Sequence, residues 1–183
     1  MIRRFLSRLH VHVHAIDRRA GTLVAGAIRV PCALGRAGAG LKTREGDGLT
    51  PIGLFRLGRL HYRADRLFPP ACGLAKRRIG RGDWWSDLPG DRAYNRLVTA
   101  RPMPDASEER LWRQDGLYDL FVDIGFNDRP VVRGRGSGIF LHVARPAFTP
   151  SAGCVVARAD ALLRVLRFVG PRTRIRIGAG VGR

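Results

Sequence analysis

Short apolar runs that alternate with polar residues are the feature of this chain that most constrains its fold. Over residues 9–14 three apolar residues alternate with three histidines, and over residues 172–177 three arginines alternate with Thr173 and two isoleucines. A period of two places successive side chains on opposite faces of a strand. Further strand-like runs are separated by Gly- and Pro-rich turns and cover residues 22–33, 52–60, 117–126 and 138–143. The sequence therefore predicts a mainly β chain.

One segment has helical periodicity instead. Leu162, Leu166 and Val169 recur at helical spacing, Asp160 lies in the expected first turn, and Gly170-Pro171 ends the run. We expect one helix that follows Cys154 and packs on the sheet behind it.

The length of 183 residues suits one domain, 1–183, with a core over about 9–178. The irregular stretch 63–115 is too long for a plain turn. It predicts a lid or a binding insertion. Its aromatic residues Trp84 and Trp85 would either contact a ligand or pack the insertion onto the sheet, and the pattern favours neither.

The strongest candidate for chemistry is the pair His142 and Cys154, which are joined by a Pro-, Ser- and Gly-containing loop. Alternation within residues 138–143 places His142 on the strand face opposite Leu141. A helix that starts after Cys154 would lower the pKa of its thiol, and an adjacent imidazole would make it an activated nucleophile. Gly153 would allow close backbone approach and free the amides of Gly153 and Cys154 as oxyanion donors.

A lone cysteine is more often a small buried residue, and a lone histidine is more often a satisfied polar one. With three cysteines in the chain at least one is unpaired, and we expect Cys32 and Cys72 to be buried free thiols rather than a disulfide. His10, His12 and His14 share a face, but they spread along the strand without an accompanying carboxylate or cysteine. They predict a solvated strand face and no metal site.

A formal charge of +18 predicts an anionic neighbour. The arginines are scattered and no zinc-finger, RNP or helix-turn-helix signature occurs, so no specific nucleic acid is expected. The basic start lacks an apolar run of secretory length, so no signal peptide is expected in this chain, and no segment predicts a transmembrane span.

Several motifs are similar to those of one family. The order His142, variable loop, Ser151-Ala-Gly153-Cys154 resembles the signature of the YkuD-type L,D-transpeptidases. Gly46-Asp47-Gly48-Leu-Thr50-Pro-Ile-Gly-Leu-Phe55 is similar to a second family segment. Shorter similarities lie at Tyr94-Asn95, Ser107-Glu108, Tyr118-Asp119 and 136–142. Two departures are Ala152, where many members have histidine, and Val156, where many have arginine.

The resemblance implies a YkuD-like β-sandwich with one C-terminal helix behind the nucleophile. It implies acyl transfer on peptidoglycan stem peptides, with Cys154 as nucleophile and His142 as base, and with the imidazole held by a backbone carbonyl at or near Val143. No metal or organic cofactor is required. Periplasm or cell envelope is the implied location, and the anionic envelope is the expected neighbour.

Expected roles extend to the residues around this pair. Ser151 and Gly153 would form the nucleophile loop, and either Arg145 or Arg158 would replace the missing arginine as a carboxylate ligand. The expected substrate-binding residues from other segments are Trp84, Tyr94, Asn95 and Tyr118. Two alternatives remain: an L,D-carboxypeptidase or hydrolase that passes the same thioester to water, and a catalytically silent basic protein that binds the envelope or nucleic acid.

Overall fold

The chain folds mainly as strands. The computed structural model describes residues 4–99, 102–104 and 109–179, so the motif Ser107-Glu108 lies outside the described residues. The one helix among them is α1 (Ala159–Leu166). The strands in chain order are β1 (Arg8–Val13), β2 (Ala20–Ala25), β3 (Ile28–Ala33), β4 (Ala39–Gly40), β5 (Thr50–Pro51), β6 (Gly53–Tyr62), β7 (Lys76–Arg78), β8 (Trp84–Trp85), β9 (Leu97–Val98), β10 (Leu120–Ile124), β11 (Phe140–Val143), β12 (Val155–Ala157) and β13 (Arg174–Ala179). The prediction of a mainly β chain with one helix is confirmed.

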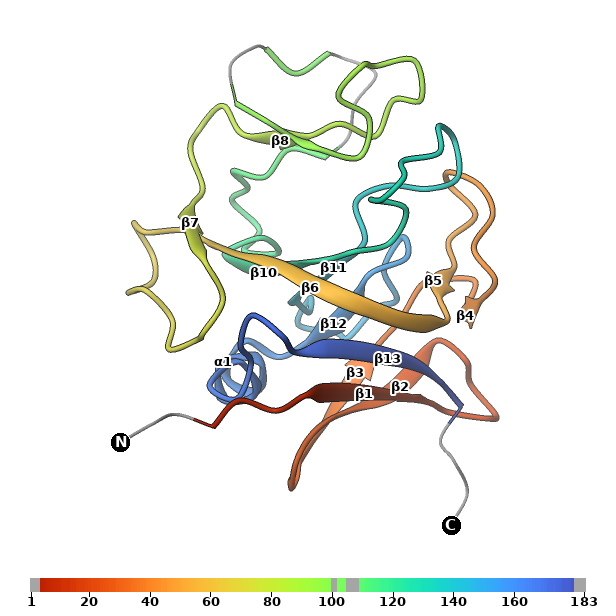
Figure 1. Cartoon of the computed structure of the whole chain (residues 1–183), viewed down its shortest axis with the longest axis vertical. Coiled ribbons are helices and arrows are strands. Elements are labelled where there is room, and N and C mark those ends of the chain that lie inside the picture. Colours follow the sequence, from red (N-terminus) through yellow and green to blue (C-terminus); the bar gives the residue numbers. More distant parts are fainter. Residues whose placement is uncertain (1–3, 100–101, 105–108, 180–183) are drawn as a thin grey trace.

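Nine strands form one sheet in the order β10-β11-β12-β3-β2-β1-β13-β6-β7, and a further pairing of β10 with β6 closes it (Figure 1). Strand β6 closes the sheet because it is long enough to pair with two different strands. Its first residues pair with β13, whereas its later residues pair with β10. A sheet that closes on itself has few free edges. The expected sandwich is therefore not confirmed, because these strands belong to one closed sheet.

The segment expected as a single strand over Thr22–Ala33 is a hairpin. Strands β2 and β3 pair in antiparallel fashion from Ala25 opposite Ile28 to Ala20 opposite Ala33. Gly26, at the turn, has a φ of 62°, which a residue without Cβ adopts at little cost. The prediction of one strand was wrong, because it passed over this turn glycine.

Two apolar clusters lie on the two faces of the sheet. The larger one includes Leu141 of β11 together with the buried residues of α1, whereas Phe140 belongs to the smaller cluster, which also contains Cys154. This split follows the predicted alternation in β11. His142 therefore lies on the same side of the strand as Phe140, away from the larger cluster.

The helix α1 differs from its prediction at both ends. It begins at Ala159 because β12 intervenes between Cys154 and the helix. It ends at Leu166, and the expected extension to Val169 is replaced by tight turns in which Phe168 and Val169 donate to Val165 and Leu166. The thiol therefore does not lie at a helix N-terminus, and the expectation that helix amides lower its pKa was wrong.

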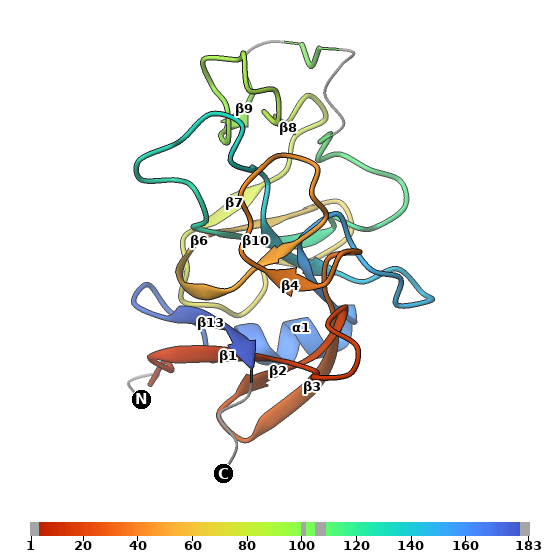
Figure 2. The same cartoon turned by 90° about the vertical axis from the view of Figure 1, so that its right-hand side faces the viewer.

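The insertion 63–115 contains short ordered elements. Strand β7 extends the main sheet beside β6, and β8 pairs with β9. Figures 1 and 2 show β8 well above β10 and β6, so the insertion stands over the sheet face that carries the smaller cluster. It therefore forms a wall above the residues that flank Cys154.

The remaining expectations from the sequence concern histidines, cysteines and membrane spans. In β1 Leu9 and Val11 are buried, whereas His10 and His12 lie on the other face, half-buried and stacked with ring centroids 5.7 Å apart. Cys32 and Cys72 are buried free thiols, as expected. Within the described ranges no helix has the length and apolar character that crossing a bilayer would require.

Candidate active site

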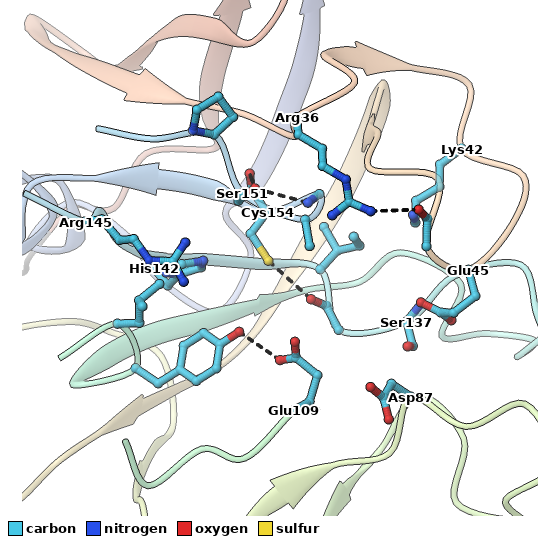
Figure 3. A pocket seen from close by; sticks show the side chains of 18 of the residues that line it. Arg36, Lys42, Glu45, Asp87, Glu109, Ser137, His142, Arg145, Ser151 and Cys154 are labelled. Atoms are coloured by element: carbon cyan, nitrogen blue, oxygen red, sulfur yellow. Dashed lines mark hydrogen bonds between the residues drawn. The ribbon is translucent and has the colours of Figure 1, made fainter. Parts of the chain in front are cut away.

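A cavity of about 590 Å³ lies between the end of the sheet and the insertion, and both His142 and Cys154 line it (Figure 3). Strand β11 contributes His142, and the loop before β12 contributes Cys154. Parallel pairing of β11 with β12 places Leu141 opposite Val155, next to the cysteine. His142 and Cys154 lie twelve positions apart in the chain, and β11 and the loop before β12 bring their side chains to one cavity. The other lining residues are Arg36, Lys42, Glu45, Gly46, Asp87, Glu109, Arg113, Leu117, Tyr118, Ser137, Gly138, Ile139, Arg145, Pro150, Ser151, Ala152 and Gly153.

The Cys154 thiol is nearly buried, with an exposed fraction of 6%. Its Sγ donates to the carbonyl oxygen of Gly138 at 3.3 Å and accepts from the amide of Phe140 at 3.3 Å. Burial raises the pKa of the Cys154 thiol to about 12, and the negative charge of Glu109 acts in the same direction. The free protein therefore holds a protonated thiol at neutral pH.

The His142 imidazole is held by a main-chain carbonyl. Its Nδ1 lies 2.9 Å from the carbonyl oxygen of Val143, the contact that the family resemblance implied. Because a carbonyl can only accept, Nδ1 carries the proton and Nε2 keeps its lone pair in the neutral ring. Burial lowers the pKa of His142 to about 4, although the carbonyls of Val143 and Leu117 favour the protonated form. The ring is thus a neutral group that can accept a proton at Nε2.

The turn from Ser151 to Cys154 is closed by the Ser151 hydroxyl. This hydroxyl donates to the carbonyl of Cys154 at 2.7 Å and accepts from the amide of Gly153 at 3.1 Å. The Gly153 amide is therefore already engaged, which contradicts the expectation that it is free to stabilise an oxyanion. Ser151 holds the loop in shape, and the amide of Cys154 remains as the candidate donor.

The Thr50-Pro51 segment supports this turn from behind. The Thr50 hydroxyl accepts from the Gly35 amide at 2.7 Å and lies 3.4 Å from the Cys154 carbonyl, to which it donates. Gly153 has a φ of 151°, and a Cβ there would lie 2.9 Å from the carbonyl oxygen of Leu49. The close approach of these two segments therefore requires glycine at position 153. The sequence contained the Thr-Pro motif, but its spacing did not reveal this supporting role.

The cavity has walls of both charges. Figure 3 shows Arg36 above Cys154 and Arg145 to its left beside His142, with Glu109 and Asp87 below, on the side of the insertion. Sequence spacing did not identify Arg36, Glu109 or Asp87, because these residues come from segments far from Cys154. Only the approach of the insertion to the sheet brings them together.

Two of the expected substrate-binding residues line the cavity, and four do not. Arg145 and Tyr118 line it, and the Tyr118 ring packs edge-on against His142 with centroids 5.1 Å apart. Arg158 lies outside the cavity on the exposed surface, where it pairs with Asp160 at 3.4 Å. Trp84 is 1% exposed and is packed inside the insertion. Of the two roles open for Trp84, the structure supports packing.

Tyr94 and Asn95 hold the loop before β11 instead of lining the cavity. The Tyr94 hydroxyl accepts from the amide of Gly136 and donates to Glu45. The Asn95 side chain accepts from the amide of Gly138 at 3.1 Å. Because the Gly138 carbonyl accepts the hydrogen bond from Cys154, both residues act on the site through this loop.

The two departures from the family motif have different surroundings. Ala152 lines the cavity, so a histidine there would reach into it. Val156 is 2% exposed in β12, where it packs in the smaller apolar cluster. Of the two arginines considered as replacements, only Arg145 reaches the cavity.

Comparison with known families gives one match. Residues 15–177 match the family model of the YkuD L,D-transpeptidase catalytic domain. Comparisons with curated proteins and with solved structures find no match.

Proposed function

The chain belongs to the YkuD family of L,D-transpeptidase catalytic domains, and from this premise we propose that it is a cysteine-dependent L,D-transpeptidase of peptidoglycan stem peptides. The observation that carries the proposal is the presence of a thiol and a neutral imidazole in one cavity, on the loop that leads into β12 and on its parallel neighbour β11. A thiol and a base in one site are the requirements for acyl transfer through a thioester.

The reaction begins from the protonated thiol. The Cys154 proton, which the Gly138 carbonyl accepts in the free protein, passes to Nε2 of His142 when the thiol turns toward the ring. The sulfur then attacks the carbonyl carbon of an L-centre that precedes a D-residue. The Cys154 amide donates to the developing oxyanion, a contribution of about 3 to 4 kcal/mol in comparable sites.

The imidazolium returns its proton to the leaving amine, which departs as a free D-amino acid and leaves a thioester on Cys154. An acceptor amine then attacks the thioester, loses a proton to His142, and forms a new amide as the thiol is restored. The carbonyl of Val143 holds Nδ1–H throughout and so keeps Nε2 as the nitrogen that exchanges protons. No further group is needed to balance either step.

The arginines that line the cavity suit a substrate with carboxylates. Arg145 lies beside the reacting pair and is our candidate ligand for a donor carboxylate. The net charge of +18 would attract the chain to an anionic cell envelope, where the stem peptides are found.

Incubation with a disaccharide-tetrapeptide followed by mass analysis tests the proposal. A crosslinked dimer is expected. A tripeptide with no dimer would indicate hydrolysis, and unchanged substrate would indicate a binding protein. Cys154→Ala is the matched control, because the loss of one sulfur costs on the order of 1 kcal/mol of stability but removes the nucleophile. Dimer formation by this variant would refute the assignment of Cys154.

A further inference from the structure

A second cavity, of about 440 Å³, lies between the insertion and the strands β6 and β10, which Figure 1 shows beneath the insertion. Its lining comes mainly from β6, from β10 and the turn after it, and from the insertion. Of the residues that line the two cavities, Ile139 alone is common to both. Because neither His142 nor Cys154 lines the second cavity, the reaction proposed above leaves it without a role.

Arginines dominate the wall of the second cavity. Five of them line it, together with two aspartates. The five are Arg56, Arg59, Arg77, Arg96 and Arg129. Like charges gathered around one cavity repel one another, which is unfavourable for folding unless counter-charges lie nearby. The net charge of the wall therefore depends on how many of these arginines have a carboxylate partner.

Two of the five arginines form ion pairs within the protein. Arg56 pairs with Asp128, one of the two aspartates of the wall. Arg77 pairs with Asp83, with Nη1 and Oδ2 2.5 Å apart. Arg96 also approaches Asp128, but it donates to the main-chain carbonyl of that residue, at 2.9 Å, and not to its carboxylate.

The other three arginines have no carboxylate partner. Within the described part of the chain, the guanidinium groups of Arg59 and Arg129 form no hydrogen bond or ion pair, and Arg96 donates to main-chain carbonyls alone. The remaining aspartate of the wall, Asp123, accepts from the Arg59 amide at 2.8 Å and lies 3.2 Å from Nε2 of His61. Three arginines and one aspartate are thus left after the internal ion pairs, an excess of two positive charges.

A buried nitrogen in the same wall is independent support for a ligand. His61 lines the second cavity, and its exposed fraction is 2%. Its ring stacks on Phe121 with centroids 4.4 Å apart, which fixes the plane of the ring. Within the described residues, Nδ1 of His61 has no hydrogen-bond partner. A buried nitrogen in this state costs free energy unless a bound molecule satisfies it.

We propose that the second cavity binds a phosphoryl group, with Arg59, Arg96 and Arg129 as its ligands. A phosphomonoester carries a charge of about −2 and three acceptor oxygens. It therefore offsets the excess charge of the wall, whereas one carboxylate offsets half of it. Guanidinium groups suit this ligand because their planar N–H donors bind phosphate oxygens in pairs. Occupation of this site does not require acyl transfer, so it is independent of the proposed function.

The phosphoryl group has two possible bearers, a soluble phosphate and the phosphomonoester headgroup of a lipid. The same oxygens are presented to the arginines in both cases. The first measurement is therefore made with inorganic phosphate, which carries the group alone.

Calorimetric titration of the full-length protein with inorganic phosphate and with acetate, slightly above neutral pH and at one ionic strength, tests the site. We expect phosphate to bind about 10-fold more tightly than acetate or better, because it carries the second charge and the third oxygen. An equal response to the two anions would show a general effect of salt and would overturn the proposal.

The double variant Arg59→Gln/Arg129→Gln should bind phosphate about 10-fold more weakly or worse, since it lacks two of the three ligands. Arg158→Gln/Arg164→Gln is the matched control. It removes the same number of charges from exposed side chains at α1, outside the cavity, and should bind as the wild type does. Equal weakening in both double variants would show that net charge and not the cavity attracts phosphate. The comparison of phosphate with acetate on the wild type decides the matter even if the first variant does not fold.

Sedimentation with phosphatidylcholine vesicles, with and without phosphatidate, identifies the bearer. Binding to phosphatidate vesicles that inorganic phosphate competes away supports the site with a lipid headgroup as its ligand. Phosphate binding without sedimentation supports the site with a soluble ligand. Sedimentation without any binding of inorganic phosphate would overturn the proposal. Since none of these measurements depends on acyl transfer, failure of the phosphoryl site leaves the proposed function standing, and the reverse also holds.

Discussion

The neutral, buried imidazole of His142 should make the protein sensitive to acid in a way that one substitution removes. Burial lowers the pKa of His142 from 6.5 to about 4. Because the folded pKa is below the unfolded one, the unfolded chain binds the proton more tightly between these values. The stability contributed by the neutral ring is complete above pH 6.5 and is lost as the pH falls through 4. A pKa difference of about 2.5 corresponds to about 3 kcal/mol.

His142→Gln keeps a donor within reach of the Val143 carbonyl but removes the titration. We expect the free energy of unfolding of the wild type to fall by about 3 kcal/mol more than that of the variant between pH 7 and pH 4. Urea denaturation at intervals across this range measures both proteins, and the carboxylates common to both cancel in the difference. Parallel pH profiles would show that His142 does not titrate as a buried neutral group, and the assignment of its lone pair to Nε2 would lose its basis.

Three further predictions concern the thiol and its support. A carbapenem should form one covalent adduct, on Cys154, because Cys32 and Cys72 belong to the main core and do not line the cavity; peptide mapping that finds the adduct on either core cysteine would contradict the site. The rate of Cys154 alkylation by iodoacetamide should rise about tenfold per pH unit from pH 7 to pH 9, since burial raises the pKa of the thiol to about 12. A rate that levels off near neutral pH would refute a protonated thiol. Thr50→Val should cost about 1 to 3 kcal/mol in urea unfolding because it leaves the Gly35 amide without its partner, whereas Thr50→Ser should cost less; equal costs would show that the hydroxyl does not support the turn.

Local pattern was sufficient to predict the main features of the strands around the site. Alternation in β11 placed His142 opposite Leu141, and the two residues do lie in different surroundings. The same reasoning found β13, where Ile175 and Ile177 are buried and Arg174 and Arg176 are exposed. The same reasoning did not predict β12. All three of its residues are buried, so the sequence shows no alternation of apolar and polar residues from which a strand can be recognised.

The main error near Cys154 was the predicted position at which the helix begins. The apolar period of α1 is visible in the sequence, but the strand that separates it from Cys154 is specified by pairing with β11 and β3. This pairing is between segments distant in the chain. Because this strand separates Cys154 from α1, the pKa of the thiol is set mainly by burial and by the charge of Glu109, and not by helix amides.

The sequence by itself determined the strand period, the one helix of the described residues and the pair of residues, His142 and Cys154, that the proposed chemistry requires, because these are properties of neighbouring residues and of short spacings. The tertiary structure alone decided the rest of the site. It packed Trp84 inside the insertion, placed Glu109 and Asp87 across from Arg36, and buried both His142 and Cys154. Burial and charge proximity depend on which distant segments the folded chain brings together, and these two quantities set the protonation states on which the chemistry depends.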